Sequence, residues 1–139
     1  MKILAIVFAV CFVGALADLT LNELANLYSN RTHCITETGV DEANVDAAKD
    51  HNDWKMDDLK LRCYFFCMQK KIKIMNEDGT LNEEITRQML AKDFPEDKID
   101  GVMMKCKDMK GADMCETAMM MTKCHVDERA LLRSTEKSP

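Results

Sequence analysis

Residues 63–67 read CYFFC and residues 106–124 read CKDMKGADMCETAMMMTKC, and these two stretches decide how the chain folds. Three residues separate the two cysteines of the first stretch, and eight residues separate each neighbouring pair in the second. With Cys34 added, the series is C-x28-C-x3-C-x38-C-x8-C-x8-C. Cysteines at such defined spacings predict a framework of cross-links.

The start of the chain predicts export. Lys2 supplies a positive charge, residues 3–13 are apolar, and Ala15-Leu16-Ala17 is a small-x-small cleavage site, so residues 1–17 are expected to be a signal peptide. Cleavage would remove Cys11 and leave six cysteines, an even number in a secreted, extracellular protein, which favours disulfides. Free thiols are disfavoured for the same reason. Structural zinc is disfavoured because no C-x2-C pair occurs.

Residues 18–139 are expected to form one domain, since their length suits a single core. Without Lys2, the 24 acidic side chains outnumber the basic ones, which argues against a nucleic-acid partner. The same acidic balance gives no reason to bind anionic lipid. No stretch after the signal is long enough to cross a bilayer, so no membrane role is expected.

The sequence predicts an all-α fold of about six helices, because it holds only five glycines and two prolines and shows no alternating strand pattern. Thr20-Leu21-Asn22-Glu23 has the form of a capping box that starts the first helix, and Thr80-Leu81-Asn82-Glu83 repeats it at the fourth. The fourth is expected to end near Lys92, and the others lie at about 40–51, 57–73, 95–110 and 112–125, followed by a polar tail.

The positions of the cysteines on these helices limit how they pair. Cys63 and Cys67 lie four residues apart on one helical face, so a bond between them would be strained and each is expected to reach a different element. Cys115 and Cys124 lie nine residues apart and face opposite sides of the sixth helix, which makes that helix central. Six cysteines allow fifteen pairings, and sequence alone does not choose among them.

The series from Cys34 to Cys124 resembles that of the six-cysteine class of insect odorant-binding proteins, the pheromone and general odorant-binding protein family. The resemblance implies about six helices around an internal apolar cavity. It also implies a non-enzymatic carrier that binds and solubilises odorants or pheromones, with no cofactor and no metal. The disulfides that it implies are Cys34–Cys67, Cys63–Cys115 and Cys106–Cys124.

The apolar side chains indicate what such a cavity would hold. The chain has twelve methionines, all but Met1 after the signal, and methionine adapts to apolar partners of varied shape. Ala118 is small and Thr122 carries a hydroxyl, so together they are expected to mark a hollow with one polar contact. By helical phase and the resemblance, the predicted ligand-binding residues are Leu59, Phe66, Ile72, Ile74, Leu81, Ile85, Met89, Val102, Met103, Ala118, Met119 and Thr122.

Other functions stay open at this point. One alternative is the same fold carrying lipids, hormones or amines in haemolymph, saliva, venom or reproductive fluid. Another is a disulfide-rich structural or toxin-like protein without a pocket. A secreted phospholipase is disfavoured, because residues 63–67 offer aromatic side chains and no histidine.

Partners and modifications are expected as follows. The partner is a small apolar ligand, with an olfactory receptor complex as a further one, and the protein is a monomer or a weak homodimer. Asn30-Arg31-Thr32 is a candidate glycosylation sequon.

His125, Val126 and Leu131-Leu132 suggest a lid that loosens in acid. Residues 76–79 resemble a calcium loop but lack its alternating carboxylates, so a turn is expected.

Overall fold

The computed structural model describes residues 21–137. The expected signal peptide, residues 1–17, and the expected N-cap Thr20 lie outside the described residues. The chain divides into two compact units, residues 1–33 and residues 34–139, and each is described by itself.

In the first unit, residues 21–33 are helical, as expected. Asn30 of the sequon is half-buried within this helix, and its glycosylation stays a prediction. The apolar side chains at helical spacing are all exposed, and they are Leu21, Leu24, Leu27 and Tyr28.

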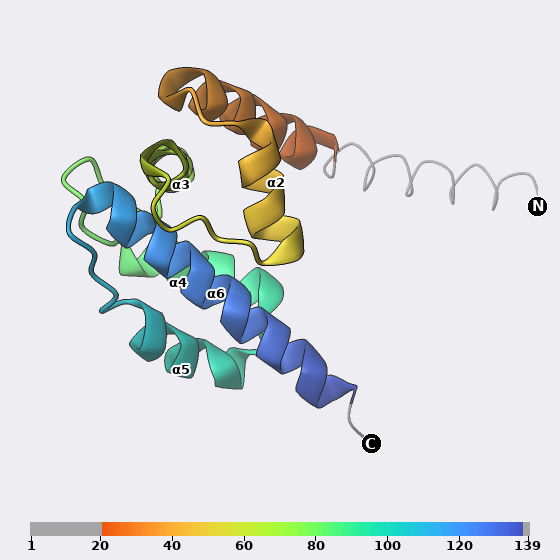
Figure 1. Cartoon of the computed structure of the whole chain (residues 1–139). Helices are drawn as coiled ribbons and strands as arrows, with labels where there is room; N and C mark the ends of the chain where they lie inside the picture. The colour runs from red at the N-terminus through yellow and green to blue at the C-terminus, as the bar shows by residue number, and fades with distance from the viewer. Residues whose placement is uncertain (1–20, 138–139) are drawn as a thin grey trace, which may run out of the picture. The chain divides into compact units, whose positions relative to one another are not determined.

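The second unit begins with the last residues of the same helix, which ends at residue 38. It continues with α2 (Glu42–His51), α3 (Leu59–Lys71), α4 (Glu83–Asp93), α5 (Glu96–Cys106) and α6 (Met114–Glu136), as Figure 1 shows. Residues 21–137 therefore hold six helices and, apart from an isolated bridge between Met75 and Leu81, no strand. The all-α prediction is confirmed. No helix in this range is both long and apolar enough to span a bilayer.

Short acidic side chains start α2 and α3. Asp41 accepts a hydrogen bond from the backbone N–H of Ala43, and Asp58 accepts from two N–H groups of the first turn of α3. Such caps satisfy the N–H groups that have no partner within the helix. α2 ends at Asn52, whose φ of 54° is a left-handed conformation that asparagine tolerates. Both helices therefore fall within two residues of the predicted ranges.

The capping box predicted at Thr80 is wrong by two residues. Asn82 caps α4 instead, by accepting from the N–H of Ile85 at 3.1 Å. Thr80 belongs to the preceding turn, where Asp78 Oδ1 accepts from its hydroxyl at 2.6 Å and from its N–H at 3.0 Å. These two bonds, the hydroxyl first, lower the pKa of the exposed Asp78 carboxyl. Because Thr80 O also accepts from Asn76 N at 2.8 Å, the backbone here is held in the expected turn.

α5 begins where the sequence predicts and ends early. Pro95 precedes it with a φ of −61°, a backbone angle that suits a helix start. The helix ends at Cys106 and not near Lys110. The chain turns at this point, since Met109 N donates to Cys106 O at 3.2 Å.

α6 is much longer than predicted. The sequence predicts an end near His125 and a polar tail, whereas residues 126–136 continue the helix. Two features explain the extension. No glycine or proline interrupts these residues, and their acidic and basic side chains reach other helices. Glu128 pairs with Lys105 of α5, and Arg129 pairs with Asp93 of α4 at 3.4 Å.

Three disulfides cross-link the second unit in the pairing that the resemblance implies: Cys34–Cys67, Cys63–Cys115 and Cys106–Cys124. Cys63 and Cys67 reach different elements, as helical geometry predicts. α6 is bonded to α3 through Cys115 and to α5 through Cys124, and it packs against both helices (Figure 1). The prediction of a central sixth helix is confirmed.

The buried apolar side chains of this unit form two clusters, and each cluster includes residues of α6. The first cluster contains Cys34, Val40, Val45, Ala48, Trp54, Leu61, Tyr64, Phe65, Cys67, Met75, Ala118, Met119 and Met121. The second cluster contains Leu90, Phe94, Ile99, Val102, Met103, Cys106 and Cys124. Most domains of this size have one contiguous core. The interior here is instead divided along α6, and the half-buried Met109 packs against both clusters.

Candidate functional site

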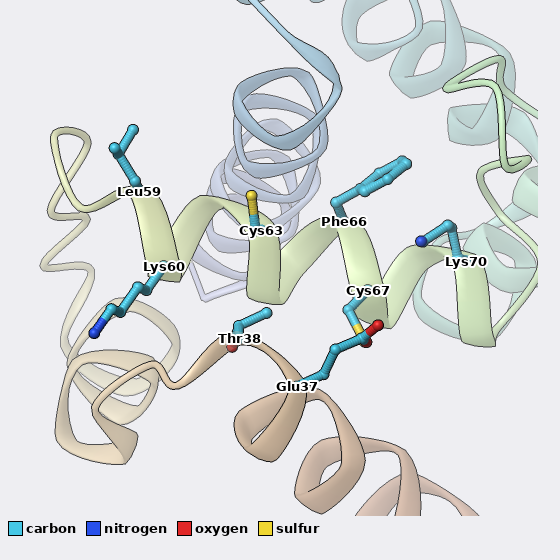
Figure 2. A pocket seen from close by; sticks show the side chains of 8 residues that line it. All are labelled: Glu37, Thr38, Leu59, Lys60, Cys63, Phe66, Cys67 and Lys70. Atoms are coloured by element: carbon cyan, nitrogen blue, oxygen red, sulfur yellow. The ribbon is translucent and has the colours of Figure 1, made fainter.

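A groove of about 350 Å³ runs along one face of α3. Two predicted ligand-binding residues, Leu59 and Phe66, line it together with two bridged cysteines of the same helix. Glu37 and Thr38, at the end of the first helix, form its other wall. Figure 2 shows Leu59 and Phe66 projecting from α3 on the side away from Glu37 and Thr38.

Charged side chains surround this α3 groove. Lys70 Nζ lies 4.5 Å from the centre of the Phe66 ring, a cation–π contact, and 3.7 Å from the carboxylate of Glu77. Lys60 is exposed at the other end of the groove. Leu59 is 65% exposed, so the apolar part of the groove is open to solvent. The α3 groove is therefore an amphipathic surface and not an enclosed apolar cavity.

Five other predicted residues are buried in the interior: Ile74, Val102, Met103, Ala118 and Met119. Ala118 and Met119 belong to the first cluster, while Val102 and Met103 belong to the second. Val102 also lines a groove of about 240 Å³ between α5 and the end of α6. The structure thus brings these residues to two sides of α6.

The four remaining apolar predictions are half-buried: Ile72, Leu81, Ile85 and Met89. Of these, Leu81 packs against the first cluster. The predicted set is therefore distributed among the α3 groove, the interior and the margin of the unit. Helical phase identified buried side chains on α5 and α6, but the buried faces of α3 and α4 carry other residues than those predicted. Phase within one helix also does not tell which helices share a cavity. Ligand contact by any of these residues stays a prediction.

Thr122 was predicted to supply a polar contact, and its hydroxyl is already engaged within the protein. It donates to the carbonyl of Ala118 at 2.8 Å and accepts from Gln69 Nε2 at 2.6 Å. Gln69, which the sequence analysis did not select, is only 5% exposed and also donates to Ala118 O at 2.9 Å. Its Oε1 has no hydrogen-bond donor within reach among the described residues. At this contact, Gln69 Oε1 is therefore the atom that can still accept a hydrogen bond.

A sequence signal for Gln69 was available. Leu61, Phe65 and Gln69 follow one another at four-residue spacing on α3, which puts them on one face of the helix. All three are buried. A polar side chain in phase with two large apolar ones is therefore the pattern that would have identified it.

His125 does not precede a separate tail. It lies within α6, where burial lowers the pKa of its imidazole below the ordinary value of 6.5. Val126 packs against the first cluster and Leu132 against the second, both from the same continuous helix. The hypothesis of an acid-sensitive tail assumed a segment separate from the sixth helix, and that assumption is wrong.

Comparisons with known proteins agree with this architecture. A model of the PBP/GOBP family matches residues 17–128. The chain is 27% identical over 128 residues to odorant-binding protein 10 of Aedes aegypti, an alignment that covers 91% of each protein.

Two solved structures resemble the fold. A fatty acid binding protein, OBP56a, from the oral disk of the blowfly Phormia regina matches with a TM-score of 0.64 and 23% identity, over 80% of this chain and 94% of that one. The medfly odorant-binding protein CcapOBP22/CcapOBP69a matches with a TM-score of 0.56 and 25% identity, over 78% and 95%.

Proposed function

The chain belongs to the PBP/GOBP family, and on that premise we propose that it carries small hydrophobic molecules, such as odorants or pheromones, among the helices of residues 34–139. The observation that carries this proposal is the family match over residues 17–128, which includes all six bridged cysteines. The composition of the interior supports it, because methionine accommodates apolar partners of several shapes. The buried methionines are Met75, Met103, Met119 and Met121.

Within the unit, the proposed ligand position is the boundary between the two clusters along α6. The predicted residues Met103 and Met119 belong to opposite clusters, and along α6 Thr122 follows the first-cluster members and precedes Cys124 of the second. The α3 groove is the less suitable position, because lysines flank it and Leu59 is largely exposed. A ligand that buries about 300 Å² of apolar surface gains roughly 7–8 kcal/mol. After association costs, binding up to micromolar affinity is expected.

The first test is a fluorescence titration of the oxidised protein with a polarity-sensitive apolar probe. Long-chain alcohols, esters, aldehydes and fatty acids then compete for the probe, and reduced protein serves as the control. Saturable micromolar binding that ligands displace and reduction abolishes is the expected result. Failure of the oxidised protein to bind any probe saturably would contradict the carrier function and favour a structural or protein-binding role.

Two variants distinguish the interior from the α3 groove. Met119→Ala removes a fully buried side chain of α6, whereas Phe66→Ala removes an aromatic side chain from the groove. Met119→Ala should change ligand affinity severalfold, and Phe66→Ala should leave it unchanged. The reverse result would place the ligand in the α3 groove.

The remaining parts of the proposal concern processing and partners. Residues 18–139 are proposed to be the mature single domain, released after cleavage at Ala17 into an extracellular fluid such as sensillar lymph. The carrier acts without catalysis, as a monomer or weak homodimer, and delivers its ligand to an olfactory receptor complex. Mass spectrometry of secreted protein tests the cleavage site, and the same spectrum treated with a deglycosidase tests occupancy of Asn30.

A further inference from the structure

The side chain of Gln69 is fixed at the contact between α3 and α6. Its Nε2 donates to Ala118 O at 2.9 Å and to Thr122 Oγ1 at 2.6 Å. The hydroxyl of Thr122 donates in turn to Ala118 O at 2.8 Å. The amide nitrogen therefore faces both acceptors on α6, which set the position of the amide plane.

The orientation of the amide follows from the Ala118 carbonyl, which can only accept hydrogen bonds. Exchanging the nitrogen and oxygen of Gln69 would place two acceptors against each other and remove the acceptor from one N–H. The Thr122 hydroxyl could adapt to such an exchange, but the carbonyl could not. The nitrogen therefore faces Ala118 O, and Oε1 is the free end of the amide.

Oε1 is buried, and no donor among residues 21–137 lies within hydrogen-bond distance of it. Buried amide oxygens in folded proteins nearly always have a partner, because an unpaired one loses the hydrogen bonds it makes with water. A donor from outside the chain would satisfy it. A ligand hydroxyl is such a donor, whereas an aldehyde, an ester or an ether presents only acceptor oxygens.

We propose that Gln69 Oε1 is the polar contact of the ligand site and that it selects apolar molecules with a hydroxyl group over acceptor-only molecules of the same length. The inference rests on the carrier function proposed above and adds the class of ligand. Gln69 is in phase with the buried Leu61 and Phe65 on α3 and meets α6 at Ala118 and Thr122. It therefore lies at the contact between α3 and α6, beside the first cluster.

The experiment compares 1-decanol, decanal and methyl decyl ether as competitors of one apolar probe on the oxidised protein. Their apolar chains match, so differences in displacement report the polar end. The expected result is that 1-decanol binds about tenfold more tightly than decanal and the ether, equivalent to about 1.4 kcal/mol. Equal affinities of the three ligands would overturn the inference and would indicate that a bound water satisfies Oε1.

Gln69→Met tests the assignment to this residue, because it keeps the length of the side chain and removes the acceptor. The ratio of alcohol to aldehyde affinity should fall to about one. Thr122→Val is the matched control: it removes a neighbouring hydroxyl and leaves Oε1 in place, so the ratio should stay near tenfold. The ratio is measured within each variant, so general loosening of the interior does not imitate the effect. Persistence of the alcohol preference in Gln69→Met would overturn the inference.

The outcome also separates this inference from the carrier function. If the probe binds saturably and the three ligands compete equally, the carrier function holds and the selection by Gln69 is wrong. If neither the probe nor any ligand binds, the carrier function fails and the inference fails with it. Retained probe affinity in Gln69→Met, with loss of the alcohol preference alone, is the result that supports both.

Discussion

Removing the Cys106–Cys124 disulfide should loosen the second cluster while the first stays folded. The perturbation is the double variant Cys106→Ala with Cys124→Ala, which avoids free thiols. This bridge ties α5 to α6 and both its cysteines belong to the second cluster. The helices that build the first cluster are held separately, since Cys63–Cys115 links α3 to α6. The two clusters therefore have different covalent restraints.

The magnitude follows from the loops that the bridges close. Cys106 and Cys124 are 18 residues apart, and Cys63 and Cys115 are 52 residues apart. In the chain-entropy description, closing these loops stabilises the folded state by about 3 and about 4 kcal/mol, respectively. Small domains have a free energy of unfolding of about 5–15 kcal/mol, so loss of about 3 kcal/mol in one region is large.

The assay follows urea unfolding with two signals. Fluorescence of Trp54, the single tryptophan, reports the first cluster, because this side chain is buried with its ring centre 5.3 Å from that of Phe65. Far-ultraviolet circular dichroism reports all helices. The two transitions should coincide in the unmodified protein. In the variant, the dichroism should change first as α4 and α5 unfold, and the Trp54 transition should move little.

Two results would refute this reasoning. If the Trp54 and dichroism transitions shift together by about 3 kcal/mol, the clusters unfold as one unit and the division along α6 has no energetic meaning. If neither transition moves by more than about 1 kcal/mol, loop closure by this bridge does not stabilise the protein. The control is Cys63→Ala with Cys115→Ala, which should shift the Trp54 transition itself by about 4 kcal/mol.

Three further predictions use single substitutions. Leu61→Ala should cost about 2–5 kcal/mol and Leu59→Ala under about 0.5 kcal/mol in urea unfolding, because Leu61 is fully buried and Leu59 is 65% exposed on the same helix; equal losses would contradict the assigned faces of α3. Gly79→Ala should destabilise by about 1–2 kcal/mol, since its φ is +84°, whereas Gly101→Ala within α5, with open space around the added carbon, should stabilise by about 0.5–1 kcal/mol, and thermal unfolding should show these opposite signs. Burial lowers the pKa of His125, so the unfolded chain binds its proton more readily, and the free energy of unfolding should fall as the pH drops below about 6.5 and through the folded pKa. His125→Gln should reduce the difference in unfolding free energy between pH 7.5 and pH 5, and an unchanged difference would assign the pH dependence to other groups.

Much of the fold could be predicted because its determinants are local. Asp41 and Asp58 start α2 and α3 through bonds to their own first turns, and Pro95 fixes the start of α5. The disulfide pairing was implied by the resemblance to the six-cysteine family, since the sequence alone leaves fifteen pairings open. The N-cap predicted at Thr80 was wrong by two residues. The Thr80 hydroxyl donates to Asp78 instead of capping the helix, and Asn82 caps α4.

The end of α6 shows the limit of local reasoning. Residues 126–136 are polar except for Val126 and Ala130-Leu131-Leu132, and by composition they suited a free tail. Their partners lie far away in the sequence: Arg129 meets Asp93 across 36 residues, and Leu132 packs against the second cluster. Whether a polar helix continues depends on such contacts as much as on its own propensity. These residues are helical because α4 and α5 form ion pairs with them and the second cluster provides an apolar surface.

The candidate site was only partly predicted, because its contacts also join residues far apart in the sequence. Helical phase marked Thr122 as a polar residue on an inward face, and the structure agrees that the α3–α6 contact is polar at this point. It could not show that Gln69, 53 residues earlier, would use the Thr122 hydroxyl as an acceptor and keep its own oxygen unpaired. Which group can still form a hydrogen bond with a ligand depends on all the donors and acceptors of both helices. Under the proposed selection by Gln69, the Ala118 carbonyl orients the amide, and the Thr122 hydroxyl that the sequence singles out is satisfied within the protein.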